Sequence, residues 1–219
     1  MLILAVDTST EYCSVALLNN DELLQEINDE APHSHNKKLF KNIDLILNSN
    51  KVDVNDIELL AIGSGPGSFT GLRVGMSAMK AISYATKIKL LPISSIEAVA
   101  LEGLEYFEES KIFVLLDGKQ KDVFLSEYKM VDQTPITVSG IVIQGYDELQ
   151  ELESRSVGNV SKDVIKIKDY YDEFFPRAYY IGKIAYKNRD KKVEDLEIEP
   201  QYYKDFKINK SKKVPLIDL

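Results

Sequence analysis

Short apolar runs alternate with amphipathic segments through the first half of this chain, and few folds can accommodate that order. Three strand patterns come first, at Leu2–Val6, Tyr12–Leu18 and Leu23–Ile27, and the polar turn Asn19-Asn20-Asp21 joins the last two. Tight polar turns connect neighbouring antiparallel strands. The first three elements are therefore predicted to form an antiparallel meander.

Helical patterns then alternate with further strands. Helices are expected over His35–Asn48, Thr70–Thr86 and Ser95–Leu104, and strands over Ile57–Ile62 and Leu90–Ile93. The order β-β-β-α-β-α-β-α requires right-handed crossovers onto a largely parallel sheet. An N-terminal α/β lobe is therefore predicted for residues 1–108.

A second unit is predicted over residues 109–219. The segment Val114–Leu125 echoes Leu4–Val15, and Asp7 and Asp117 take equivalent places at the ends of two apolar strands. This lobe is expected to be smaller and less regular, with the last helix and the tail able to pack back on the first lobe. Its expected elements are a strand at Ile136–Ile143, a helix at Tyr146–Glu153, a strand at Val164–Ile167 and a helix at Ala178–Arg189.

Charge and cysteine content restrict the class of protein. The formal net charge of -8 argues against a protein that grips nucleic acid by itself. A single cysteine, Cys13, allows no internal disulfide, and the start "MLILAVDTST" is typical of a buried strand. A cytoplasmic protein without a membrane span is expected. The lysine-rich stretch Tyr202–Val214 is interpreted as a solvated tail, or as a weak contact with RNA or an acidic partner.

The loop "GSGPGSFTG", Gly63–Gly71, lies between a predicted strand and a predicted helix. It matches neither the P-loop, which needs a lysine, nor the dinucleotide fingerprint, which needs a third glycine. Ser68 or Thr70 could cap the following helix, and free amides at a helix start can hold an anion. A tight turn without a ligand is the alternative, and the spacing leaves both open.

Other candidate sites are sparse. Asp7, with Thr8, Ser9 and Thr10, could orient a phosphate or a metal-bound water, or it could simply cap its own turn. His33 and His35 are the only histidines. They are too few for a catalytic metal, which usually has three protein ligands.

The helix that follows the loop is apolar around much of its circumference. Small residues form one stripe and bulkier residues another, so both sides should be buried. One side should face the sheet of its own lobe. The other could meet a second helix of this chain or of a partner.

Several segments together resemble one family. They are "ILAVDTST", His35 before the first helix, "GSGPGSFTGLRVG", "PISSIEAVA", Asp117 with "DVFLSEY", and "EPQYY". In this order and spacing the chain resembles the bacterial TsaB proteins, formerly called YeaZ, over essentially its whole length. The second half departs from the pattern at Asp117-Gly118-Lys119 and at Tyr202-Tyr203-Lys204.

The resemblance implies an actin-like fold of the sugar kinase and chaperone ATPase superfamily, with two RNase H-like lobes, each a mixed sheet flanked by helices. It also implies a non-catalytic, activating subunit in the synthesis of N6-threonylcarbamoyladenosine at position 37 of tRNAs. Such a subunit pairs with a TsaD-type catalytic subunit and helps to recruit a TsaE-type ATPase. Alone it is expected to form a homodimer, and its contact with tRNA is expected to be indirect or weak.

Two sets of residues follow from this interpretation. A vestigial nucleotide site, or one that shares ATP or ADP with the partner, would comprise Asp7, Thr8, Ser9, Thr10, Gly65, Gly67, Ser68, Thr70 and Gly71. The partner interface would comprise Leu39, Ile43, Leu72, Arg73, Met76 and Met79. No intrinsic cofactor or metal is expected. The rival hypothesis is an autonomous ATPase or a metallopeptidase-like enzyme, the activity implied by the older name glycoprotease.

Overall fold

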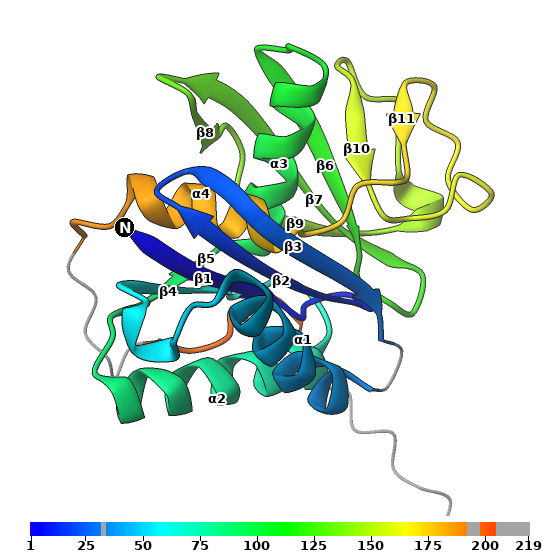
Figure 1. The fold of residues 1–219 in the computed structure, drawn as a ribbon. Coiled ribbons are helices and arrows are strands. Elements are labelled where there is room, and N and C mark those ends of the chain that lie inside the picture. The colour runs from blue at the N-terminus through cyan, green and yellow to red at the C-terminus, as the bar shows by residue number, and fades with distance from the viewer. Residues whose placement is uncertain (32–33, 192–197, 205–219) are drawn as a thin grey trace, which may run out of the picture.

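Two β-sheets, one from each half of the chain, carry helices on their faces and form two lobes (Figure 1). This computed structural model describes residues 1–31, 34–191 and 198–204. The two-lobed α/β architecture is the actin-like fold class that the resemblance implied, and the prediction of that fold class is confirmed.

The first sheet has the strand order β3-β2-β1-β4-β5. Its first three strands are antiparallel neighbours, whereas β4 and β5 run parallel to β1, as the predicted crossovers require. The element order β-β-β-α-β-α-β-α is confirmed. The strands are β1 Leu2–Asp7, β2 Tyr12–Asn19, β3 Glu22–Glu30, β4 Leu59–Gly63 and β5 Leu90–Ile93.

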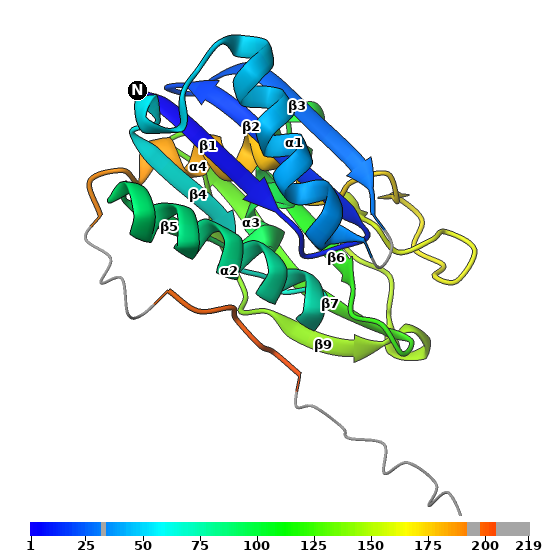
Figure 2. The ribbon, with the colours of Figure 1, turned by 60° about the horizontal axis from the view of Figure 1, so that its bottom comes forward.

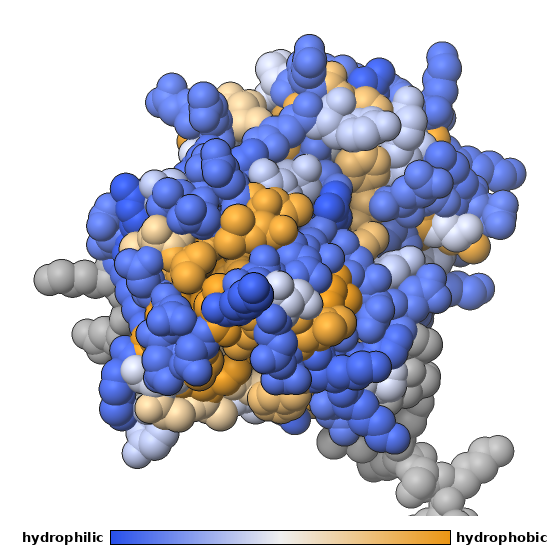
Figure 3. Space-filling model, in the orientation of Figure 1, coloured by the Kyte–Doolittle hydropathy of each residue, from blue (hydrophilic) through white to orange (hydrophobic). Residues whose placement is uncertain are grey.

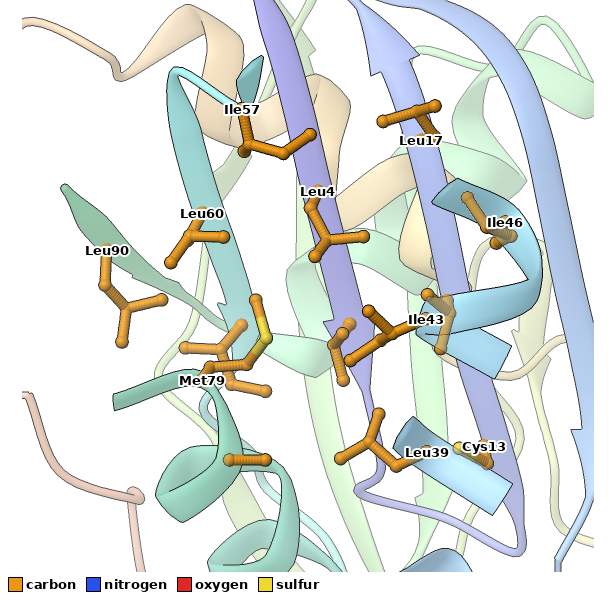
Figure 4. Close-up of a cluster of buried hydrophobic side chains, with 14 of the residues drawn as sticks. Leu4, Cys13, Leu17, Leu39, Ile43, Ile46, Ile57, Leu60, Met79 and Leu90 are labelled. Carbon is orange, nitrogen blue, oxygen red and sulfur yellow. The ribbon is translucent and has the colours of Figure 1, made fainter. Parts of the chain in front are cut away.

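Helices α1 (His35–Asn50) and α2 (Phe69–Thr86) cover one face of this sheet, as Figure 2 shows. Strand side chains alternate between faces, so Leu4 points to these helices while its neighbour Ile3 points to the opposite face. In Figure 4, Leu4 lies among side chains of both helices, including Ile43 and Met79. A short 3-10 turn, η1 (Val54–Asp56), follows α1.

The opposite face is covered by a helix from the other end of the chain. Helix α4 (Ala178–Lys187) packs on β1, β2 and β4, beside α3 (Ser95–Tyr106). A Cβ atom at Gly182 would lie 2.5 Å from Leu18 Cδ1, so glycine allows α4 to approach the sheet closely. At its start, Ala178 N donates to Ser14 Oγ at 2.7 Å.

The second sheet has the order β11-β10-β6-β7-β8, and β9 also pairs with β7. Helix α3 packs between the two sheets, with contacts to β6 and β7 on one side and to α4 on the other. The strands are β6 Lys111–Asp117, β7 Asp122–Val131, β8 Thr134–Thr137, β9 Val142–Gly145, β10 Ser156–Gly158 and β11 Tyr170–Tyr171. Asp7 and Asp117 end the first strand of their respective sheets, as predicted.

The structure corrects three expectations in this second half. The predicted strand Ile136–Ile143 is divided between β8 and β9, and the predicted helix Tyr146–Glu153 is only a 3-10 turn, η2 (Tyr146–Glu148). The predicted strand Val164–Ile167 is not a strand: residues 162–164 form a turn, and Ile165 after it packs into a buried cluster. The final helix was predicted correctly except that it ends at Lys187.

Within the described residues, no helix combines the length and the apolar character needed to span a membrane. Of the lysine-rich stretch Tyr202–Val214, only residues 202–204 lie within the described part of the chain.

Candidate functional site

The glycine loop connects β4 to α2, next to the turn that follows β1. A Cβ atom would lie 1.8 Å from Asp7 Oδ2 if placed on Gly63, 2.2 Å from Ser9 O on Gly67, and 2.0 Å from Thr8 O on Gly71. Cβ atoms essentially never come this close to other atoms. The glycines are therefore required by the Asp7–Ser9 turn, which packs directly against the backbone of the loop.

Hydrogen bonds hold this turn against the loop. Ser68 N donates to Ser9 O at 2.6 Å, and Thr8 Oγ1 donates to Gly71 O at 2.8 Å. Ser68 Oγ accepts from Gly71 N at 3.2 Å, so Ser68 caps α2 as the sequence suggested. The start of α2 is thus fastened to the turn and capped by a residue of the loop itself.

Asp7 is fully enclosed. Its Oδ1 accepts from Ser9 N and Ser9 Oγ, each at 2.7 Å, and its Oδ2 accepts from Ser95 Oγ at 2.7 Å. Burial raises the pKa of the Asp7 carboxyl to about 6, although these hydrogen bonds act in the opposite direction. Of the two interpretations of Asp7, the geometry favours a carboxylate that caps its own turn.

The nine residues of the predicted nucleotide site are thus not all accessible. Asp7, Thr8 and Ser9 are at most 1% exposed, because they form the turn under the loop. Thr10, Ser68 and Thr70 line open hollows between the lobes. Of the three glycines in the set, Gly65 faces the backbone oxygen of Gln201, while Gly67 and Gly71 pack on the turn.

The cleft between the lobes contains the accessible polar groups. One hollow of about 360 Å³ is lined by residues from both lobes, among them Thr10, Ser68 and Asn159. Lys119 crosses it, with Nζ 2.9 Å from Glu11 Oε1 in the first lobe and 2.8 Å from Asp117 Oδ2 in the second. Tyr12 and Phe175 also stack across the lobes, with ring centroids 4.0 Å apart.

Negative charge dominates this hollow. Glu11, Asp117, Asp172 and Glu173 line it, against the single cation Lys119. Two of these acids already bind Lys119, so its charge is balanced within the protein. A nucleotide phosphate would meet excess negative charge here and would find no free cation among the residues that line the hollow.

Sequence reasoning missed Glu11 and Lys119. Their positions in the sequence could have pointed to them, because each lies a few residues after the aspartate that ends the first strand of its lobe. The echo between the two lobes pointed to these turns without showing that their charged residues meet.

The structure corrects most of the predicted interface residues. Leu39, Leu72 and Met79 are at most 1% exposed, and Ile43 and Met76 are 6% and 3% exposed. The bulky stripe of α2 faces the lobe's own core, and Gly75 and Ala78 are buried beside it. The small residues Ala81 and Ala85 face outward.

Arg73 is the one predicted interface residue that is exposed. Its guanidinium carbon lies 3.6 Å from the centre of the Phe69 ring, and its Nε donates to Tyr202 Oη at 3.0 Å. Tyr202 belongs to the segment 198–204, which lies beside α2 in Figure 2. Ring contacts on two sides therefore determine where this cation points.

No metal site was recognised in the described part of the chain, where no group of three or more His, Cys, Asp and Glu residues could hold an ion. His35 lines a hollow of about 440 Å³ that lies between the starts of α1 and α2 and is bordered by Lys119 of the second lobe. Asn36 and Val74 also line it. His33 lies outside the described residues.

The chain matches known sequences over most of its length. The family model for tRNA N6-adenosine threonylcarbamoyltransferase (TsaD) matches residues 27–187. The tRNA threonylcarbamoyladenosine biosynthesis protein TsaB of Haemophilus influenzae is 36% identical over 58% of this chain and 53% of that protein. The protein of the same name from Bacillus subtilis is 24% identical over 86% of this chain and 82% of that protein.

The chain thus spans little more than half the length of the Haemophilus influenzae relative, and 55% of the Escherichia coli protein of the same name, to which it is 30% identical. A solved structure, YeaZ from Pseudomonas aeruginosa, superposes with a TM-score of 0.81 at 21% identity, covering 92% of this chain and 99% of that one. This likeness shows that the two chains share a fold.

Proposed function

The chain belongs to the tRNA N6-adenosine threonylcarbamoyltransferase family, and within it to the TsaB (YeaZ) proteins of threonylcarbamoyladenosine biosynthesis. We propose that it is a non-catalytic, activating subunit of the enzyme that makes this nucleoside. In this proposal it pairs with a TsaD-type catalytic subunit and helps to recruit a TsaE-type ATPase. Contact with tRNA is indirect or weak, and the chain alone forms a homodimer.

The closed loop is the observation that carries the non-catalytic part of the proposal. A catalytic carboxylate or phosphate site at the end of β1 must be open to substrate, whereas Asp7 is 0% exposed and bonded on both oxygens. The loop glycines serve the packing of the turn. The loop thus holds the start of α2 in place, as expected for a helix that presents a surface to a partner.

The outer faces of α1 and α2 are the proposed docking surface. Phe40 is 54% exposed and lies four residues after Asn36, which shares a hollow with Val74 of α2, so Phe40 faces the same side. On α2, Ser77 and Ala81 are exposed and small, so a partner helix could approach the backbone closely. These residues replace the buried ones that the sequence suggested.

Where the assembled enzyme holds ATP or ADP near this chain, we place the nucleotide at the subunit interface. Ser68 and Thr70 line the hollows that adjoin the docking surface, whereas Asp7 is fully buried and has no open space beside it. No intrinsic cofactor is proposed for this chain.

Reconstitution tests this function. The purified chain is mixed with a TsaD-type subunit, and the mass of the complex is measured at micromolar concentration. A heterodimer that raises threonylcarbamoyl transfer to tRNA is expected, together with no ATP turnover or peptide hydrolysis by the chain alone. Activity of the isolated chain that Asp7→Ala abolishes would instead establish the rival enzyme hypothesis.

A further inference from the structure

The outer face of α2 carries a row of cations. Arg73, Lys80 and Lys87 follow one another at intervals of seven residues, with Ser77 and Tyr84 between them at helical spacing. Seven residues are nearly two turns, so Arg73 and Lys80 lie on one side of the helix, about 10.5 Å apart. Lys87 caps the end of the helix just after Thr86, and its Nζ lies 4.2 Å from the centre of the Tyr84 ring. We call Arg73, Lys80 and Lys87 the basic row.

The basic row has no acidic counterpart within α2. The helix contains no aspartate or glutamate, although the whole chain has a formal net charge of -8. Within the described residues, none of the three cations forms an ion pair with a carboxylate. Glu199 lines a hollow with Lys80 and Lys87 but forms no ion pair with either in this part of the chain.

Arg73 differs from the other arginines of the chain. Arg155, Arg177 and Arg189 each have a carboxylate oxygen within 4.0 Å, whereas among the described residues Arg73 has none. Arg73 is instead held by rings, with Phe69 at 3.6 Å and Tyr202 bonded to its Nε at 3.0 Å. Within the described part of the chain, both terminal nitrogens can therefore bind a carboxylate in the bidentate geometry that arginine favours.

We propose that the basic row recognises an acidic helix of the partner protein, with Arg73 as the fixed anchor and Lys80 and Lys87 as the flanking charges. The inference rests on the proposed function and adds the chemistry of the partner's surface. Carboxylates at seven-residue spacing on a helix packed along α2 would meet Arg73 and Lys80, and an acidic residue past the end of α2 would meet Lys87. The exposed small residues Ser77 and Ala81 allow that helix to lie close.

RNA fits this face less well than a protein helix. Duplex nucleic acid carries one charge per about 1.7 Å of its axis, far denser than one cation per about 10.5 Å. The overall charge of -8 also repels a polyanion at low salt. A helix with a few carboxylates matches both the spacing and the number of charges.

The test measures the dissociation constant of the heterodimer with the TsaD-type subunit for the full chain and for charge-reversal variants. Arg73→Glu, Lys80→Glu and Lys87→Glu each alter the basic row. Lys166→Glu, at an exposed lysine of the second lobe, makes the same change in net charge elsewhere. Each variant is first checked for an unchanged thermal melt, and Arg73→Gln provides a milder second variant.

Each reversal in the basic row is expected to weaken the pair at least about tenfold at about 0.1 M salt, since close interfacial charge pairs couple strongly. The effect should shrink at about 1 M salt, where charges are screened within about 3 Å. Tyr202→Phe keeps the ring but removes the hydrogen bond to Arg73, so it should weaken the pair by a smaller factor. Lys166→Glu should change the affinity less than about twofold, as expected for a charge outside the interface.

Unchanged affinity in every variant of the basic row, with a normal wild-type complex, would overturn this inference and leave the proposed function intact. Weakened binding of tRNA with an unchanged heterodimer would assign the row to RNA and would also overturn it. Failure of the wild-type chain to form any complex would remove the proposed function and the inference together.

Discussion

At the scale of single residues, the glycine loop shows what a sequence can and cannot reveal. Its composition predicts close backbone approach and a capped helix start, and both are found. It does not reveal what approaches the glycines. The Thr8 carbonyl that requires Gly71 lies more than sixty residues earlier in the chain, and one sequence contains no record of that contact.

Gly71→Ala should destabilise the fold strongly. The added methyl would lie 2.0 Å from Thr8 O, a backbone atom that cannot move without disturbing β1. A loss of about 2 to 4 kcal/mol in the free energy of unfolding is expected from urea denaturation. Gly140→Ala is the matched control, since nothing lies within 4 Å of its new methyl. Equal stability of the two variants would show that the loop can relax.

Asp7 should make stability fall as the pH rises. Its pKa is raised from 3.8 to about 6 in the fold, so the folded chain binds more protons than the unfolded chain between these values. This contribution is fully present below pH 3.8 and is lost as the pH rises to about 6. A shift of about two units corresponds to about 3 kcal/mol.

The measurement compares wild type with Asp7→Asn, which keeps the shape but cannot ionise. Free energies of unfolding are determined at pH 4 and pH 7 for both proteins. Relative to the variant, the wild type should lose up to about 3 kcal/mol between these pH values. A constant difference between the two proteins would mean that Asp7 is ionised in the fold throughout this range.

At the scale of elements, α2 shows the limit of helical periodicity. The pattern correctly predicted the helix and two apolar stripes, one bulky and one small. It could not show that the bulky stripe is buried while the small stripe is divided, with Ala78 buried and Ala81 and Ala85 exposed. The neighbours that each residue meets decide this, and they come from α1 and from strands distant in sequence.

Met76 should behave as a core residue, contrary to its predicted role at the partner interface. Met76→Asp places a carboxylate where the side chain is 3% exposed, and a loss of about 4 kcal/mol or more is expected. Its neighbour Ser77 is exposed, and Ser77→Asp should melt within a few degrees of wild type. Thermal melts followed by circular dichroism separate the two, and a stable Met76→Asp variant would contradict this assignment.

The strands of the second half were predicted less well because they are short. β10 has three residues and β11 has two, too few to show any alternation of apolar and polar side chains. β10 pairs with β6, and β11 pairs with β10. The Tyr170 hydroxyl also accepts from the amide of Val160 and donates to its carbonyl. Such nonlocal bonds leave no periodic signal in the sequence.

At the scale of the whole molecule, the segment 198–204 ties the lobes together. Ile198 is buried in the core under α1 and α2, and Gln201 N donates to Ser64 O at 2.8 Å. The segment then reaches the second lobe, where Lys204 Nζ bonds Gly118 O at 2.8 Å and lies 2.5 Å from Asp122 Oδ2. In the sequence, "EPQYY" is a mark of the family and Tyr202 and Lys204 fall in a lysine-rich stretch, but neither feature shows that the segment bridges the lobes.

Lys204→Ala should loosen the turn between β6 and β7. It removes an ion pair and two hydrogen bonds to backbone carbonyls at the end of the second lobe. Faster amide exchange over residues 118–124 is expected by mass spectrometry, with a loss of about 1 kcal/mol in global stability. Lys166→Ala serves as the control, and identical exchange in both variants would show that the segment does not restrain the second lobe.

The return of α4 to the first sheet has a consequence during synthesis on the ribosome. The strands of that sheet are complete once Ile93 has been made, but the helix that covers Ile3, Ala5 and Leu18 ends at Lys187. At about 5 to 20 residues per second, the uncovered sheet waits on the order of 5 to 20 seconds for this helix. The nascent first lobe therefore keeps an apolar face open while the second is translated, and a ribosome stalled in that interval would hold an aggregation-prone chain.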